Sequence, residues 1–471
     1  MRYASGVTWK RIFFLTLVLQ TLNGWSDSLP CIDLLPYFPP SGLRKLSYCE
    51  ETTINAYRKV GSRSSKWDSN AEPALLIYAR FICAEQVVAG TTNFDVMAKG
   101  LKAALDAGCD DPLVEYAAVR LSQREINFGP KRRAVTKSSV EIYRNIIEGL
   151  KTHPYPGIRQ TFMYLRAAET LQQDRADRTQ IQDLLITSAE QLAQAIKDRA
   201  NRDDIYPVAG EIFNTYRSVA GDRKPIFDAF QRQVVKKGIL TNEVALVVKA
   251  MFYIQWGWDA RGAGTMDSVT SEGWRLFIER LATAREMLEF AWKQDPTDAF
   301  ACSQMMGALA AAGRPRIEWD QWFQLGKKAN LACGALYMVK LNYLQPKWGG
   351  SEKETIQFAR ECVKEGNWKE LIPFILIDAY DQLDGDQILF NTSYRFSDGW
   401  NEIQDVYESY LKQFPGNNGI RSVYCHFAVK AKKWELAKRL LDQMGDLVVP
   451  QAFHGGYTYD VQEINRHANL N

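Results

Sequence analysis

The stretch YCHFAVKAKKWELAKRLL (424–441) decides the fold class, because it has the pattern of two short helices joined by a tight turn. In its first half the aromatic Tyr424 and the small Ala428 are four residues apart, so they share one helical face. After the polar turn, Trp434 and Ala437 open a second amphipathic segment that runs into two leucines. A small residue lets the partner helix approach closely, and an aromatic ring fills the wedge that remains. The stretch therefore predicts a packed helix pair.

The same order of small residue, turn and aromatic residue recurs upstream. Phe358 and Ala359 precede a Gly-Asn-Trp turn at 366–368, and a helical stretch at 400–417 ends on Phe-Pro. This spacing is similar to that of tetratricopeptide helix pairs, although no strict period is kept. A single pair cannot bury its apolar stripe, so pairs stack on one another. We therefore predict an all-α fold: an irregular, tetratricopeptide-like α-solenoid of antiparallel helix pairs.

Prolines and glycines divide the remaining chain at intervals that suit helices of roughly 10 to 18 residues. We interpret 61–73, which ends on Pro73, as a polar loop, and we expect Pro207 to lie between helices. Sustained alternation of apolar and polar residues is hard to find, and Tyr457 to Val461 is the nearest approach to it. Strands are therefore not expected.

The N-terminus has the order of a secretory signal. Residues 1–11 carry Arg2, Lys10 and Arg11 without any acid, and 12–22 is an apolar run of eleven. A bilayer-spanning helix needs about 20 apolar residues, so a permanent anchor is disfavoured. We predict a signal peptide at 1–24 and an exported protein, periplasmic or extracellular, with no stable membrane insertion. A buried N-terminal helix is the alternative.

Charge argues against a nucleic-acid partner. Removing residues 1–24 takes away three positive charges, so the formal net charge falls from +3 to 3 − 3 = 0. A neutral protein has no general field that attracts nucleic acid or anionic membrane. The one basic cluster, at 131–137, is interpreted as a solvated loop rather than a phosphate site.

The eight cysteines are too widely spread to form a disulfide framework, and none stands in a CxxC pair. Disulfides are permitted in an exported chain, and Cys31 with Cys49, which flank a proline-rich segment, is the pair we predict. Buried free thiols are the alternative for the others. Four histidines without metal-ligand spacing, and aspartates at 378–386 that miss the EF-hand order, predict no metal site. No nucleotide or nucleophile motif appears, so no cofactor is expected.

More specific than a repeat is YIQWGWDARGAGTMDSV (253–269), together with Leu344-x-Pro-x-Trp-Gly-Gly-Ser at 344–351 and GCDDPLV at 108–114. These elements, in order over about residues 75 to 365, resemble a bacterial family catalogued only as a domain of unknown function. The resemblance implies a tetratricopeptide-like helical fold in an exported or envelope-associated protein, and it implies no activity. The chain is then divided into a signal peptide (1–24), a proline-rich lead and loop (25–73), a helical-repeat core (74–365) and C-terminal helix pairs (366–471).

Two loops of that resemblance form the candidate ligand-binding site. In the first, Trp258 offers apolar area, Arg261 a directional contact, and Gly262 and Gly264 end a helix. Arg261 is expected to stack on Trp258, to reach an exposed carbonyl, or to bind a carboxylate of a ligand. The second loop consists of Trp348, Gly349 and Gly350. Most tryptophans between 256 and 348 are expected to be wedges between helices, and the second loop is first a stop and a start between helices.

A solenoid exposes a long surface suited to peptides and proteins. We therefore expect a non-catalytic exported binding or scaffold protein with a protein or peptide partner. The alternative is a carbohydrate-active enzyme on an α/α toroid, which needs a pair of carboxylates in one cleft. Asp259, Asp267 and Glu272 are the acids that the first loop offers for it.

Overall fold

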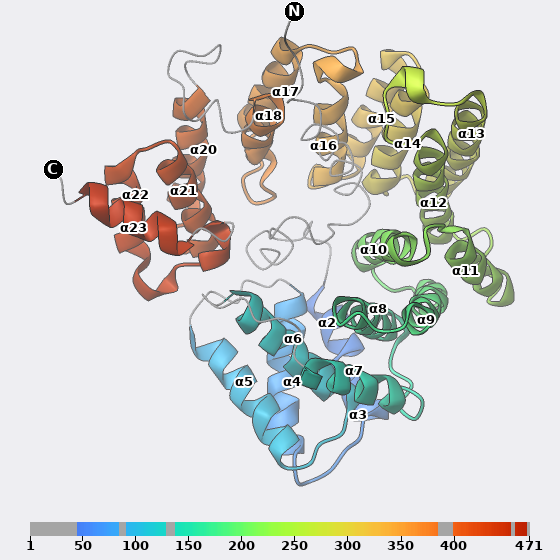
Figure 1. Cartoon of the computed structure of the whole chain (residues 1–471), viewed down its shortest axis with the longest axis vertical. Coiled ribbons are helices and arrows are strands. Elements are labelled where there is room, and N and C mark those ends of the chain that lie inside the picture. The colour runs from blue at the N-terminus through green and yellow to red at the C-terminus, as the bar shows by residue number, and fades with distance from the viewer. Residues whose placement is uncertain (1–44, 84–90, 129–136, 385–398, 454–456, 469–471) are drawn as a thin grey trace, which may run out of the picture. The chain divides into compact units, whose positions relative to one another are not determined.

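The computed structural model describes residues 45–83, 91–128, 137–384, 399–453 and 457–468 (Figure 1). Within these ranges every regular element is a helix, and no strand occurs. The predicted all-α class is confirmed, and the alternating stretch after Tyr457 is helical as well. The predicted signal peptide at 1–24 and Cys31 lie outside the described residues, so both stay predictions.

The chain divides into two compact units. The described residues from Tyr143 to Tyr343 make up the first unit. The second consists of the described residues up to Ile142 and those from Leu344 onward. Helix α7 (Lys137–Gly149) spans the boundary between the two stretches of sequence.

The first unit is a succession of helices joined by short connections. They are α8 (Gly157–Gln173), α9 (Arg178–Lys197), α10 (Arg202–Ala220), α11 (Lys224–Lys236), α12 (Glu243–Arg261), the 3-10 turn η2 (Met266–Ser268), α13 (Ser271–Gln294), α14 (Ala299–Ala311), α15 (Arg316–Ala329) and α16 (Gly334–Tyr343).

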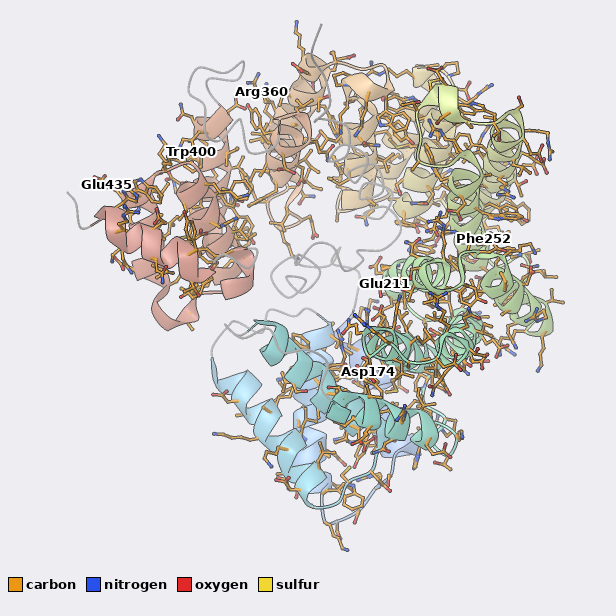
Figure 2. The ribbon with its side chains drawn as sticks, viewed as in Figure 1. Asp174, Glu211, Phe252, Arg360, Trp400 and Glu435 are labelled. Atoms are coloured by element: carbon orange, nitrogen blue, oxygen red, sulfur yellow. The ribbon has the colours of Figure 1, made fainter. Side chains whose placement is uncertain are left out.

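Successive helices of this unit pack in pairs, most extensively α8 with α9, α12 with α13 and α14 with α15. The first helices of neighbouring pairs also pack: α8 on α10, α10 on α12, α12 on α14 and α14 on α16. An ion pair joins two of them, since Nη2 of Arg166 on α8 lies 2.8 Å from Oε2 of Glu211 on α10 (Figure 2). Each pair thus contacts the next one along the chain, which is consistent with a solenoid.

The second unit is also helical. Its elements are α2 (Leu46–Thr52), α3 (Ile54–Val60), α4 (Asp68–Ile82), α5 (Thr91–Asp106), α6 (Pro112–Phe128), η3 (Pro346–Trp348), α17 (Glu352–Glu365), η4 (Ile372–Phe374), α18 (Ile375–Asp384), α20 (Gly399–Gln413), α21 (Asn418–Lys430), α22 (Trp434–Met444), η5 (Gly445–Leu447), η6 (Pro450–Phe453) and α23 (Tyr457–Ala468). The stretch 424–441 supplies the packed pair α21 and α22, in which Ala428 and Ala437 are fully buried. This predicted pair is confirmed.

Two predicted helix boundaries are wrong, and both errors involve proline. Pro73 lies inside α4, so the polar loop ends at Trp67 rather than at 73, and Pro207 lies inside α10. At the start of α4, Asp68 accepts hydrogen bonds from the Tyr57 hydroxyl (2.6 Å) and from Arg63 Nη2 (3.0 Å). These contacts with preceding residues fix the start of the helix upstream of the proline. A proline near the beginning of a helix removes few of its backbone hydrogen bonds.

Many of the helices end in the same way. After α9, the N–H of Arg199 donates to Ile196 O (3.0 Å) and the N–H of Ala200 donates to Ala195 O (2.9 Å). This is the Schellman pattern, in which one residue takes the left-handed conformation. The pattern recurs after α5, α8, α11, α14 and α21. Glycine holds the left-handed position after α5, α11 and α14, whereas Arg175, Arg199 and Lys432 hold it elsewhere.

Candidate functional site

Helix α12 carries the first half of the predicted site at its C-terminal end. The helix starts at a cap in which Oδ1 of Asn242 accepts the N–H of Ala245 (3.1 Å). Its middle is buried on nearly all sides, because α12 packs against α9, α10, α13 and α14. Phe252 is one of these core residues, and it stacks on Phe227 with ring centroids 3.9 Å apart (Figure 2). Trp258 and Arg261 therefore project from the last turn of a firmly anchored helix.

The helix ends at the predicted glycine. Gly262 has a φ of 75°, which a side chain disfavours, and its N–H donates to Trp258 O (2.9 Å). The residues that follow, 262–268, are all exposed. The prediction that the glycines end a helix in a tight turn is confirmed for Gly262.

Arg261 lies between two tryptophans. Its guanidinium carbon is 5.4 Å from the ring centroid of Trp258 on α12 and 5.4 Å from that of Trp274 on α13. Its Nη1 donates to the carbonyl oxygens of Gly262 (3.1 Å) and Gly264 (3.0 Å). Ring stacking and a carbonyl contact were alternatives in the prediction from sequence, and the structure shows both. Partial burial lowers the pKa of Arg261.

The two tryptophans are held by one buried phenylalanine. Phe277 of α13 is 1% exposed, and its ring centroid lies 4.8 Å from that of Trp258 and 5.8 Å from that of Trp274. Neither tryptophan is fully buried. The α12–α13 pair thus has two partly buried tryptophan rings and a guanidinium that contacts both, next to an exposed turn. Trp274 is among the tryptophans that were expected to be wedges between helices, and its contact with Arg261 was not predicted.

A charged network that sequence analysis missed supports the same helix end. Arg223 is 4% exposed, and it donates through Nη2 to Oδ1 of Asp259 (3.2 Å) and through Nη1 to Oδ1 of Asn214 (3.1 Å) and to Gln255. Nε of Arg217 lies 2.7 Å from Oδ1 of the same aspartate. Asp259 therefore holds together the ends of α10 and α12 and the start of α11. No spacing in the sequence marks Arg223 as its partner, because the pairing depends on the tertiary fold.

A second guanidinium lies on a tryptophan at this end of the pair. Arg280 of α13 has its guanidinium carbon 3.4 Å from the ring centroid of Trp256, and its Nη1 donates to Trp256 O (2.6 Å). Burial lowers the pKa of Arg280, while the carboxylates of Asp259 and Glu279 act in the opposite direction.

The second half of the predicted site is a tight turn at the start of the 344–471 segment. Pro346–Trp348 forms the 3-10 turn η3, and Gly349 follows with a φ of 87°. A Cβ on Gly350 would lie 2.0 Å from Leu344 O, so only glycine fits there. The turn then opens α17, where the hydroxyl of Ser351 accepts the N–H of Glu354 (3.2 Å). The stop-and-start interpretation of this loop is confirmed, and Trp348 is half-buried beside it.

The two halves of the predicted site belong to different units: Trp258 to Gly264 to the first, and Trp348 to Gly350 to the second. Ligand binding by these residues stays a prediction.

The expectation that most tryptophans are wedges agrees with the structure. None of the seven between 256 and 348 is exposed, and Trp319 is buried. Trp292 on α13 and Trp322 on α15 meet edge to face, with centroids 5.8 Å apart.

The seven cysteines among the described residues are all buried. Burial raises the pKa of the Cys109, Cys333 and Cys425 thiols to about 12 and raises that of Cys302 further. Such thiols behave as small apolar groups. Cys49 is buried as well, and since Cys31 lies outside the described residues, the Cys31–Cys49 disulfide stays a prediction.

The aspartates at 378–384 and the histidine His426, which were considered as metal ligands, were also located in the structure. The aspartates at 378, 381 and 384 lie on α18, as expected for an acidic helix end, and Asp386 lies outside the described residues. His426 is buried, and its Nδ1 lies 2.6 Å from Oδ2 of Asp460 on α23. Among the described residues, no group of histidine, cysteine and acidic side chains has the geometry to hold a metal ion.

Comparison with known proteins gives no relative: no protein-family model matches the chain, and no curated protein matches its sequence. The described helices include none that is both long and apolar enough to cross a membrane. The family resemblance and the exported location therefore remain expectations drawn from the sequence.

Proposed function

We propose that this chain is a non-catalytic, exported binding or scaffold protein whose partner is a protein or a peptide. The observation that carries the proposal is the cluster at the end of the α12–α13 pair. There Trp258 and Trp274 stand on either side of Arg261, beside the exposed turn 262–268. Tryptophan and arginine are the residues that most often dominate protein interfaces.

The way in which the two tryptophans and the turn 262–268 are held in place supports the same proposal. The rings of Trp258 and Trp274 pack on the buried Phe277, and the turn is tied to Arg261 by two hydrogen bonds. A preorganised contact surface loses little side-chain entropy when a partner binds. Helical repeat proteins that bind peptides use rigid surfaces of this kind.

The contacts of the three acids considered for the glycosidase alternative do not favour that function. Asp259 is bound by Arg217 and Arg223, and a hydrogen bond from Arg275 lowers the pKa of Glu272. A glycosidase needs one carboxyl with a raised pKa to act as general acid. Asp267 lies exposed on the short turn η2.

Co-purification tests the proposed function. The purified chain, immobilised through an affinity tag, is exposed to the envelope and secreted proteins of its own source cells. We expect a specific partner whose affinity falls by about 2 kcal/mol, or roughly 30-fold, in Trp258→Ala. Ile278→Ala is the matched control, because this side chain is 45% exposed on the neighbouring helix α13.

Far-UV circular dichroism is recorded for both variants to show that they remain helical. If Trp258→Ala captures every partner as well as the wild type does, the assigned surface is wrong. If no protein is retained while a glycan array is bound, the carbohydrate alternative replaces the proposal.

A further inference from the structure

The arginines at the end of the α12–α13 pair differ in what neutralises them. Arg217 and Arg223 share the carboxylate of Asp259. Arg275 lies 2.7 Å from Glu272 Oε1 and 2.7 Å from Glu279 Oε2. Arg280 has no such direct pair with a carboxylate of the described ranges, but the charges of Asp259 and Glu279 act on it.

Arg261 is the exception in this group. Burial alone lowers its pKa, and no carboxylate of the described residues opposes that effect. It is therefore a partly buried cation whose charge is not balanced within the described chain. Such a group gains more from an anion than a fully solvated arginine does, because it has already lost part of its hydration.

Only one of the three guanidinium nitrogens of Arg261 is used by the described fold. Both of its hydrogen bonds to the turn, to Gly262 O and Gly264 O, come from Nη1. Among the described residues neither Nε nor Nη2 of Arg261 has a hydrogen-bond partner, and these two nitrogens form the edge of a guanidinium that binds a carboxylate with two parallel hydrogen bonds. The guanidinium also contacts two tryptophan rings, which limit its motion.

We infer that Arg261 recognises a carboxylate group of the bound peptide, while Trp258 and Trp274 contact the apolar part of the same residue. This assignment rests on the proposed function and specifies the chemistry of its partner. The carboxylate belongs either to an acidic side chain or to the C-terminus of the peptide, since both present the same pair of oxygens.

Three dye-labelled peptides of one length separate these sources. The first carries three glutamates and an amidated C-terminus, the second carries glutamines and a free C-terminal carboxylate, and the third carries glutamines and an amidated C-terminus. Binding to the full chain is measured by fluorescence polarisation at low salt. We expect the first or the second peptide to bind at least about 10-fold more tightly than the third, as two charge-assisted hydrogen bonds imply. Preference for the first identifies a side chain, and preference for the second identifies the C-terminus.

Variants assign the effect to Arg261. Arg261→Gln is expected to remove the preference for the carboxylate peptide, and Arg261→Lys to retain only part of it, because lysine lacks the planar fork. Arg275→Gln is the matched control, since Arg275 already has two glutamates. Circular dichroism establishes that each variant is folded.

The inference is overturned if all three peptides bind alike, if none binds, or if folded Arg261→Gln keeps the preference of the wild type. The proposed function is judged separately, by the loss of the co-purified partner in Trp258→Ala. A chain that loses its partner in Trp258→Ala but shows no carboxylate preference keeps the function and loses the inference.

Discussion

Asp259 was identified from the sequence as a candidate residue, but its role was not predicted. It stands in the Trp-Asp-x-Arg element, and we weighed it as a possible catalytic acid. In the structure it is the shared carboxylate partner of the exposed Arg217 and the buried Arg223. It therefore belongs to the support of the candidate site rather than to its contact surface.

Asp259→Asn should destabilise the chain strongly, because it leaves the guanidinium of Arg223 buried without its counter-charge. We expect a loss of about 3–5 kcal/mol in the free energy of unfolding, as for other broken buried ion pairs. Urea denaturation followed by circular dichroism measures it. Arg217→Gln, which removes the exposed partner of the same carboxylate, should cost no more than about 1 kcal/mol. Equal losses in the two variants would show that Arg223 does not depend on Asp259.

The two adjacent glycines of the Trp-Gly-Gly-Ser turn have different reasons to be glycine. In Gly350→Ala the new methyl group would overlap Leu344 O, so we expect a loss of about 3 kcal/mol or more. In Gly349→Ala the new methyl group meets open space, so the cost is only the steric penalty of alanine in the left-handed conformation, about 1 kcal/mol. Thermal unfolding of both variants checks the order. If Gly349→Ala were the more harmful, the turn would have been described wrongly.

Glu115 of α6 gives the stability a dependence on pH. Burial first, and then the nearby charges of Asp110 and Asp111, raise its pKa from 4.5 to about 7. An acid whose pKa is higher in the folded than in the unfolded protein stabilises the fold while it is protonated. This contribution is full below the unfolded pKa, and it is lost as the pH rises through the folded pKa of about 7. The free energy of unfolding of the wild type should therefore fall relative to Glu115→Gln between pH 4.5 and pH 7.

Denaturation curves at several pH values measure this difference, with Glu141→Gln on the surface of α7 as control. If the difference between wild type and Glu115→Gln is constant over this range, Glu115 does not titrate as described.

At the scale of elements, the shared helix ending explains why the repeat is hard to see in the sequence. The Schellman pattern closes α8, α9 and α21 without glycine, so the usual glycine mark of a helix end is missing there. The helix pair at 424–441 was predicted from its small and aromatic residues alone. Pro73 and Pro207 misled the assignment of boundaries, because α4 begins upstream of the first at Asp68 and α10 begins upstream of the second at Arg202.

Arg199→Gly should stabilise the chain, since Arg199 has a φ of 56° and glycine adopts that conformation without a steric penalty. We expect a gain of about 1 kcal/mol in the free energy of unfolding. Lys197→Gly, on the last residue of the same helix, removes the same charge and should instead cost about 1 kcal/mol. Opposite signs in chemical denaturation are the expected result, and a loss in both variants would contradict the assigned helix ending.

At the scale of the whole molecule, helical periodicity and the aromatic and small residues were sufficient to predict the class, since they report local packing. The charged network of Arg217, Arg223 and Asp259 was not predictable, because its members come from three helices and no sequence spacing links them. The Arg261 contacts were predictable because Trp258 lies on the same turn of α12. Trp274 joined them only through the packing of α12 on α13.

The proposed function requires that a partner binds at the end of the α12–α13 pair. Both helices are anchored by buried residues, and the turn between them is exposed. A bound peptide should therefore protect that turn without rearranging the helices on either side. The tryptophans of other pairs, such as Trp292 and Trp322, pack on each other and should be unaffected.

Hydrogen–deuterium exchange of the chain with and without its co-purified partner tests the central claim most directly. We predict that amide exchange slows in the segment 256–275, which contains the last turn of α12 and the exposed turn, while α14 and α15 stay unchanged. Protection confined to other segments, or equal exchange with and without saturating partner, would contradict the proposed binding surface.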